Sequence, residues 1–306
     1  MSATTTAPTG RLTRPGPGTR MPLVLIAVRQ YRWIALVVAL PAARVCVALL
    51  RHYGSWADAL ALRDRVGGQE YHFGRYAHDA HQVTAQLVND GASLAFQPAL
   101  LAAVVTAVLT AREWESRRVV LALTQSVTPR RWFTVRWAVL AAVLAAVTVP
   151  PVVLYRISVV HGFGRNLLTF GAERQNAYYT IGPVTVAHVL LGVAAGALAG
   201  TFLRRTLPAL VAAPVLTWLV AGALVRSRAV LLVDFPLFSK VDGFHPGGIV
   251  GLQFYDALPQ DSYLMNSLTP GDYWGYQIAS SVLVLAAAAL LTAAALRVLR
   301  RRTAAY

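Results

Sequence analysis

Residues 111–137 read AREWESRRVVLALTQSVTPRRWFTVRW, a basic stretch between two long apolar runs. It carries six arginines, at positions 112, 117, 118, 130, 131 and 136, against two acids, Glu113 and Glu115. Lysine and arginine collect in the cytoplasmic loops of membrane proteins, so this stretch marks one side of a bilayer. Its pattern is also too regular for a simple connection between two spans.

Within this stretch the apolar residues follow a helical pattern with polar flanks. Val119, Val120, Leu123 and Val127 recur at the spacing of one helix face. Proline disfavours helical backbone in the residue before it, so Pro129 should end this helix near Thr128. We therefore predict a short amphipathic helix between the two neighbouring spans.

The composition is that of a membrane protein. The chain has 306 residues, of which 56% are hydrophobic and only 13% are charged, whereas soluble domains carry roughly a quarter charged residues. The net charge of +15 is gathered in a few segments, which a membrane protein explains better than nucleic-acid binding. We predict no nucleic-acid partner. The single cysteine, Cys46, excludes an intrachain disulfide.

Apolar runs occur at six places in the chain. Each is near the roughly 20 residues that a spanning helix needs, and a helix satisfies its own backbone hydrogen bonds in lipid. The fold class predicted is an all-α membrane protein with six transmembrane helices. The predicted spans are about 33–50, 92–111, 135–155, 181–203, 207–225 and 277–299.

The distribution of charge orients these spans. With the N-terminus inside, the inner segments hold seventeen lysines and arginines against two acids, whereas the outer segments hold ten against eleven acids. The positive-inside tendency then places both termini in the cytoplasm. We expect a multi-pass protein of the plasma membrane.

Several further elements are expected. Residues 1–20 are rich in Ser, Thr, Pro and Gly and should be a disordered tail before a single transmembrane domain, 21–306. Residues 21–32 suit an interfacial helix, unless the first span simply begins earlier. An outer loop is predicted at 51–91, with a helix-like stretch inside it. In a second outer loop, the apolar patch at 229–238 is too short to span and suits a re-entrant segment before the last span.

Missing motifs narrow the function. A nucleotide-binding loop needs Gly-Lys-Ser/Thr, and the only lysine, Lys240, stands between Ser239 and Val241. All thirteen acids are expected in loops, which disfavours a proton-coupled transporter, since such proteins place titrating carboxylates inside the membrane. The histidines of the first outer loop are interpreted as exposed polar residues, so we predict no metal site.

Three residues within the spans are candidates to line a substrate conduit: Arg44, Gln97 and His188. Arg44 lies about 16 Å into the first span, where an arginine should face protein or a wet cavity. Alternatively, its guanidinium snorkels or binds carbonyls freed near Pro41. His188 could relay protons, but more often such a histidine bonds a neighbouring helix.

Three glycines repeat at four-residue spacing in the fourth predicted span. Gly192, Gly196 and Gly200 make one smooth helix face on which another helix can approach closely. We predict a packing role for them, either within the chain or at a seam between two copies.

The basic stretch also resembles a known family. EWE followed by TQSVTPRRW is similar to the segment after the second span of ABC-2-type transporter permeases, in particular an actinobacterial group of membrane subunits. Arg117 and Arg118 depart from the pattern, because they stand where Gly-Thr is usual. The close match covers about 25 residues, while the six-span layout agrees over the whole chain. The matching residues are Glu113, Trp114, Glu115, Gln125, Ser126, Val127, Thr128, Pro129, Arg130, Arg131 and Trp132.

This resemblance implies how the protein is driven. It implies a homodimer, or one half of a heterodimer, of permeases served by cytosolic ATP-binding subunits, with ATP and magnesium in the partner and no cofactor in this chain. It also implies that the first inner loop holds a coupling helix that docks on the ATPase. The residues carried over as coupling candidates are Glu113, Glu115, Gln125, Ser126, Thr128, Arg130 and Arg131.

Our leading functional hypothesis is the permease subunit, without enzymatic activity of its own, of an ATP-driven exporter of a lipophilic or amphiphilic compound. The alternative of a different class is a membrane anchor or sensor that transports nothing and whose outer loops bind a ligand. A secondary transporter is a third hypothesis, disfavoured by the expected absence of acids within the membrane.

Overall fold

The computed structural model describes residues 21–66, 70–116, 128–164, 182–231 and 270–303. These residues form helices and no strand. Each helix contains a stretch long and apolar enough to cross a membrane, so the predicted all-α membrane fold with six spanning helices is confirmed. The helices are α1 (Met21–Val66), α2 (Glu70–Glu115), α4 (Pro129–Gly164), α6 (Val184–Leu203), α7 (Thr206–Leu231) and α10 (Pro270–Thr303).

Some predicted elements lie outside the described residues. These are the N-terminal tail at 1–20, the amphipathic helix that should end near Thr128, and most of the apolar patch proposed as re-entrant. The first three residues of that patch continue α7, which ends at Leu231. Thr128 itself is not helical, and Pro129 begins α4. Proline suits the first position of a helix because its missing N–H would have no helical partner there.

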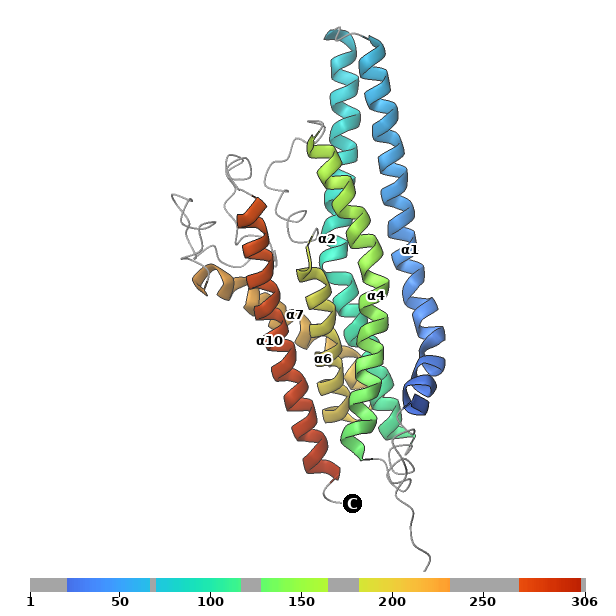
Figure 1. Cartoon of the computed structure of the whole chain (residues 1–306), viewed down its shortest axis with the longest axis vertical. Helices are drawn as coiled ribbons and strands as arrows, with labels where there is room; N and C mark the ends of the chain where they lie inside the picture. Colours follow the sequence, from blue (N-terminus) through green and yellow to red (C-terminus); the bar gives the residue numbers. More distant parts are fainter. Residues whose placement is uncertain (1–20, 67–69, 117–127, 165–181, 232–269, 304–306) are drawn as a thin grey trace, which may run out of the picture.

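The two N-terminal helices are longer than predicted. Residues 21–32 are the first turns of α1 rather than a separate helix, and no glycine or proline separates them from the span. The expected outer loop at 51–91 is largely helical, because α1 continues to Val66 and α2 begins at Glu70. The two helices extend side by side beyond the rest of the bundle (Figure 1). Helix formers such as Ala, Leu and Arg in the stretch 55–66 favour this extension.

Helix α6 lies at the centre of the bundle. It packs against α2, α10, α7 and α4, and 72% of its apolar window is buried. Helix α1 lies at the other extreme: it packs mainly on α4 and α2 among the described helices, and 11% of its window is buried. Figure 1 shows α10 on one side of α6 and α1 on the far side of α4.

The seam between α6 and α2 is made of small residues. A Cβ built on Gly192 would meet the carbonyl oxygen of Ala99, and one built on Gly196 would meet that of Ala103. At Gly200 the added atom would lie 2.7 Å from the Cβ of Thr110. The glycine face therefore packs within the chain, backbone against backbone, along the length of α2. Close approach of this kind is a general way to join helices where the hydrophobic effect is absent.

Several buried hydroxyl groups donate hydrogen bonds within their own helices. Thr106 donates to the Ala102 carbonyl at 2.7 Å, and Thr201 donates to the Ala197 carbonyl at 2.8 Å. A side chain that bonds its own helix can be buried without a partner on another one. Thr106, which lies against Gly196, therefore contributes packing surface on the seam without requiring a partner on another helix.

The glycine seam predicts a size-dependent effect on stability. Replacing Gly192 with alanine should lower the free energy of unfolding by about 1–3 kcal/mol, because the new methyl group meets rigid backbone on α2. The matched control is Gly54→Ala on α1, where an added Cβ meets no atom within 4 Å. That change should be neutral or raise stability by up to about 1 kcal/mol through helix propensity. Equal effects of the two changes, measured by unfolding the purified protein in detergent, would contradict the seam.

Candidate functional site

A buried ion pair joins the last turn of α2 to the start of α4. Nη2 of Arg136 lies 2.6 Å from Oε1 of Glu113, and each side chain is only 9% exposed. Nε of Arg136 donates a hydrogen bond of 2.9 Å to the Tyr31 hydroxyl on α1. The guanidinium also lies over the ring of Trp132, 5.0 Å from its centroid. The pair therefore links α2, α4 and α1.

A second carboxylate links α2 to α7. Oε1 of Glu115 accepts a bond of 2.7 Å from the backbone N–H of Thr206, and Oε2 accepts one of 2.6 Å from the Thr206 hydroxyl. Thr206 is the first residue of α7. The N–H groups of a first helical turn lack helical partners and form the positive end of the helix dipole, which favours a carboxylate there. Glu115 therefore acts as a cap supplied by another helix.

Arg204, in the turn between α6 and α7, lies against an aromatic stack formed by α2 and α4. Trp114 lies against Phe133 with ring centroids 6.0 Å apart and planes 17° apart. The guanidinium of Arg204 lies 4.7 Å from the Trp114 ring centroid on α2. Arg204 has φ of 56° and its N–H donates to the Gly200 carbonyl. Glycine usually occupies this left-handed position at a helix end, so the contact with Trp114 helps to offset an unfavourable backbone.

Helix α10 reaches the same end of the bundle. Nη1 of Arg302 lies 3.4 Å from the Thr201 carbonyl oxygen on α6, a long hydrogen bond. Leu299 and Ala295 of α10 pack with Phe133 and Trp137 in one buried cluster. All the described helices thus meet at this end, which we call the arginine-rich end. We call the residues whose side chains or backbone link different helices there the hub: Tyr31, Glu113, Glu115, Arg136, Arg204 and Thr206.

Exposed cations surround the hub. Arg112 at the end of α2, Arg130 and Arg131 at the start of α4, and Arg205 before α7 are all exposed. Thr128 is exposed as well, and its carbonyl accepts the N–H of Trp132 at 3.1 Å. These residues border the segment 117–127, which contains Gln125 and Ser126 and lies outside the described residues.

The coupling candidates thus separate into two groups. The carboxylates of Glu113 and Glu115 bind other helices of the chain, so they fix the end of α2 that precedes the segment. Thr128, Arg130 and Arg131 present exposed side chains. The expectation that every acid lies in a loop is wrong. Asp90, Glu113 and Glu115 fall within the apolar span Asn89–Glu115, because α2 continues as a helix past both ends of the apolar run.

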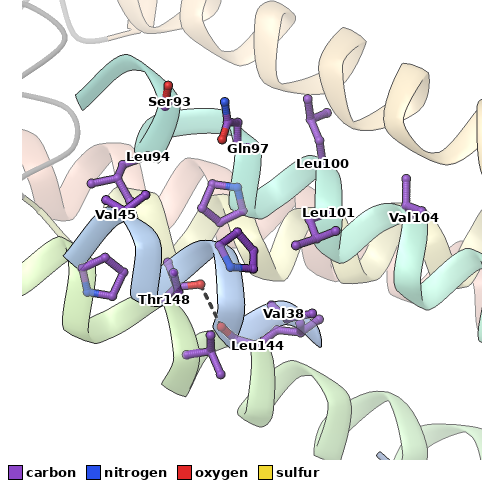
Figure 2. Close-up of a pocket in the computed structure, with 15 residues that line it drawn as sticks. Val38, Val45, Ser93, Leu94, Gln97, Leu100, Leu101, Val104, Leu144 and Thr148 are labelled. Carbon is purple, nitrogen blue, oxygen red and sulfur yellow. Dashed lines mark hydrogen bonds between the residues drawn. The ribbon is translucent and has the colours of Figure 1, made fainter. Parts of the chain in front are cut away.

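A cavity of about 450 Å³ lies among α1, α2 and α4. Figure 2 shows side chains of the three helices around it, including Val38, Gln97 and Thr148. Its lining is mainly aliphatic, with polar side chains at Ser93, Gln97 and Thr148. The Thr148 hydroxyl donates to the Leu144 carbonyl at 2.8 Å. Of the three residues predicted to line a conduit, the cavity includes Gln97.

The other two conduit candidates lie elsewhere. Arg44 is exposed on α1 and is not part of the cavity lining, although its neighbours Ala42 and Val45 are. The expectation that Arg44 faces protein or a wet cavity is therefore not met within this chain, because the helix turns its side chain outward. His188 is buried on α6, with Nδ1 2.9 Å from the Val184 carbonyl oxygen and its ring 5.7 Å from that of Phe96.

Several residues of the hub escaped the sequence reasoning. Arg136 was counted among the loop cations, yet it lies about two turns inside α4 and is buried. Tyr31 and Thr206 are far from Glu113 and Glu115 in sequence, so no local pattern connects them. One signal in the sequence could have suggested the hub. Glu113 and Glu115 stand on either side of Trp114 at the end of an apolar run.

The comparisons with known proteins give one family. A family model described as ABC-2 membrane transporter related matches residues 42–228, which is more than half of the chain. The match includes α2, α4 and α6 with the basic stretch between the first two. No curated protein and no solved structure matches the chain.

The ion pair predicts a strong asymmetry between single and double changes. Glu113→Leu alone should lower the free energy of unfolding by about 3–5 kcal/mol, because it leaves Arg136 buried without its counter-charge. Glu113→Leu combined with Arg136→Met should recover much of that loss, since both charges are then gone. Unfolding in a denaturing detergent measures both.

The matched control for this cycle is Arg130→Leu, which removes an exposed arginine from the same helix. It should change stability by no more than about 0.5 kcal/mol. A double variant as unstable as the sum of its two single changes would show that Glu113 and Arg136 act independently.

Proposed function

The chain belongs to the ABC-2 membrane transporter related family, and we propose that it is the permease subunit of an exporter driven by a separate ATP-binding subunit. The family describes membrane subunits of transporters, and the chain is a multi-pass membrane protein. We propose a lipophilic or amphiphilic substrate, because the spanning helices are almost entirely apolar. The observation that carries the proposal is the hub, because its contacts link the two helix ends that flank the basic segment to α1 and α7.

Energy for transport is proposed to come from the partner. The chain has one lysine, Lys240, and it is not followed by Ser or Thr as a phosphate-binding loop requires. ATP and magnesium would then bind to the partner subunit. Transporters of this kind work as two permease halves with two ATPases, and we propose that this chain forms such a dimer with itself or with a related permease.

The segment 116–128 is the proposed contact for the ATPase. It connects α2 to α4, and the ion pair between Glu113 and Arg136 closes its two ends against each other. A push on the segment would therefore move α2 and α4 as one body. Through Tyr31 and Thr206 the same displacement would reach α1 and α7. Rocking of packed helices around a central path is a general mechanism of alternating access.

The roles of the coupling candidates follow from this arrangement. We propose that Gln125, Ser126, Thr128, Arg130 and Arg131 face the ATPase, whereas Glu113 and Glu115 fix the base of the segment. The arginine-rich end is proposed to be cytoplasmic, which the charge distribution favours. The protein would then lie in the plasma membrane with both chain termini in the cytoplasm.

Charge reversal at the start of α4 should separate docking from folding. Arg130→Glu with Arg131→Glu should reduce co-purification of the co-expressed ATP-binding subunit at least tenfold, because two exposed arginines at the proposed interface change sign. Thermal stability of the isolated permease should be unchanged. The matched control is Arg300→Glu with Arg301→Glu, two exposed arginines on α10 that are remote from the segment in sequence. Equal loss in both pairs would indicate non-specific charge attraction and contradict the proposed docking site.

Transport itself can be measured in inside-out vesicles that contain the permease and its ATPase. A fluorescent neutral amphiphile should accumulate in the vesicles with ATP and magnesium, and not with ADP. Accumulation that is the same with either nucleotide, or that needs no ATPase subunit, would overturn the exporter proposal.

A further inference from the structure

We propose that the cavity among α1, α2 and α4 binds an uncharged amphiphile whose single polar head donates a hydrogen bond, and that this molecule enters from the bilayer. As a statement about the transported substrate, the inference rests on the proposed function. As a statement about binding, it stands on the cavity alone and can be tested without the ATPase.

The size and walls of the cavity suit a small apolar molecule. Its volume of about 450 Å³ falls in the range of ligand pockets, roughly 300–1,000 Å³. Aliphatic side chains from all three helices form most of the wall, among them Val38, Leu101 and Leu144. None of the described residues that line it is charged. A charged group would lose its hydration there without gaining a counter-charge, so the ligand is uncharged.

The polar part of the cavity is concentrated at Gln97. Its side chain is exposed, although it lies about 12 Å inside the span that begins at Asn89. An amide at that depth is costly unless it finds a hydrogen-bond partner. Ser93 lies one turn earlier on the same helix face and also lines the cavity. Thr148 adds little, because its hydroxyl proton already goes to the Leu144 carbonyl. Gln97 therefore marks where the head of the ligand binds.

Prolines supply hydrogen-bond acceptors around the same space. Pro41 of α1, Pro98 of α2 and Pro151 of α4 all line the cavity. A proline inside a helix has no N–H to give to the carbonyl four residues before it. For Pro98 and Pro151 those carbonyls belong to Leu94 and Val147, which are themselves lining residues. The Leu94 and Val147 carbonyls therefore lack their usual helical donor, so we infer that the head of the ligand is a donor such as a hydroxyl or an amide.

The geometry also gives a route of entry. Helix α1 is the least buried of the described helices, and its apolar residues Leu36, Val37 and Leu40 are exposed to the surroundings. It forms one wall of the cavity, so a molecule dissolved in the bilayer reaches Gln97 by passing α1. Lipid acyl chains are the competing occupant, because they would fill the apolar part but have no use for Gln97.

The test compares four photoreactive probes with the same sixteen-carbon chain: an alcohol, a hydrocarbon, a carboxylate and a trimethylammonium. Each is added to the full chain in lipid nanodiscs, and the labelled peptides are identified by mass spectrometry. We expect the alcohol to label peptides of the cavity lining at least tenfold more than either charged probe. Gln97→Leu should reduce labelling by the alcohol about fivefold and leave labelling by the hydrocarbon unchanged.

Filling the cavity gives an independent variant. Val104→Trp should abolish labelling of the lining by both uncharged probes. Leu101→Phe is a smaller change that can replace it if Val104→Trp impairs folding, and it should reduce the same labelling. The matched control, Leu210→Trp, places the same ring on an exposed position of α7 and should leave labelling unchanged. Melting temperatures of all variants establish that the bundle is intact.

Two results would overturn the proposal. Equal labelling by all four probes would mean that the cavity does not select its occupant. Labelling by the alcohol that survives both Gln97→Leu and Val104→Trp would mean that the probe binds elsewhere. The proposed function fails separately: if the alcohol binds as expected but ATP hydrolysis by the partner never releases it, the binding site stands and the exporter does not.

Discussion

The arginine-rich end of this protein depends on the buried ion pair between Glu113 and Arg136. Two charges with 9% of their side chains exposed are stable only together, since removing one leaves the other without compensation. Arg136 contributes further contacts to Tyr31 and Trp132, and Glu115 nearby caps α7 through Thr206. A single pair therefore fixes how α2 and α4 meet, and its neighbours bring α1 and α7 to the same place.

Packing is uneven across the bundle: one side of α2 is tightly packed, and the other side lines the proposed binding cavity. On one side, the glycines of α6 lie against the backbone of α2 with no room for a methyl group. On the other side, α1 and α4 carry prolines and leave a cavity against α2. Helix α2 belongs to both sides. It presents small residues such as Ala103 to the seam, and presents Gln97 and Leu101 to the cavity, so a movement of α2 driven from the hub would alter the cavity directly.

The sequence was sufficient for the features that depend on composition and local pattern. Apolar length predicted the spans, and four-residue spacing predicted a packing face at Gly192, Gly196 and Gly200. The partner of that face was left open, because periodicity tells which residues share a side of a helix but not which helix lies opposite. The same limit applies to the cavity, where Gln97 was a candidate without its neighbours.

The errors have physical causes as well. Glu113 and Glu115 were predicted as coupling residues, and the structure adds that their carboxylates bind Arg136 and Thr206, which are too remote in sequence for a local pattern to reveal. Residues 51–91 were predicted as an outer loop with a helix-like stretch inside it, whereas that stretch continues the first span as one helix to Val66, as its helix propensity favours. Arg44 was expected to face protein or a wet cavity, or else to snorkel, and within this chain its side chain is exposed on α1.

The central claim is that the ion pair holds the ends of α2 and α4 as one body beneath the proposed coupling segment. Spin labels on cysteines at Arg112 and Arg130, both exposed, measure it directly once the natural Cys46 is replaced by alanine. Pulsed electron paramagnetic resonance in nanodiscs should give one narrow distribution of label distances in the parent protein. The distribution should broaden or become multiple in the Glu113→Gln variant. Identical distributions in the two proteins would contradict the account.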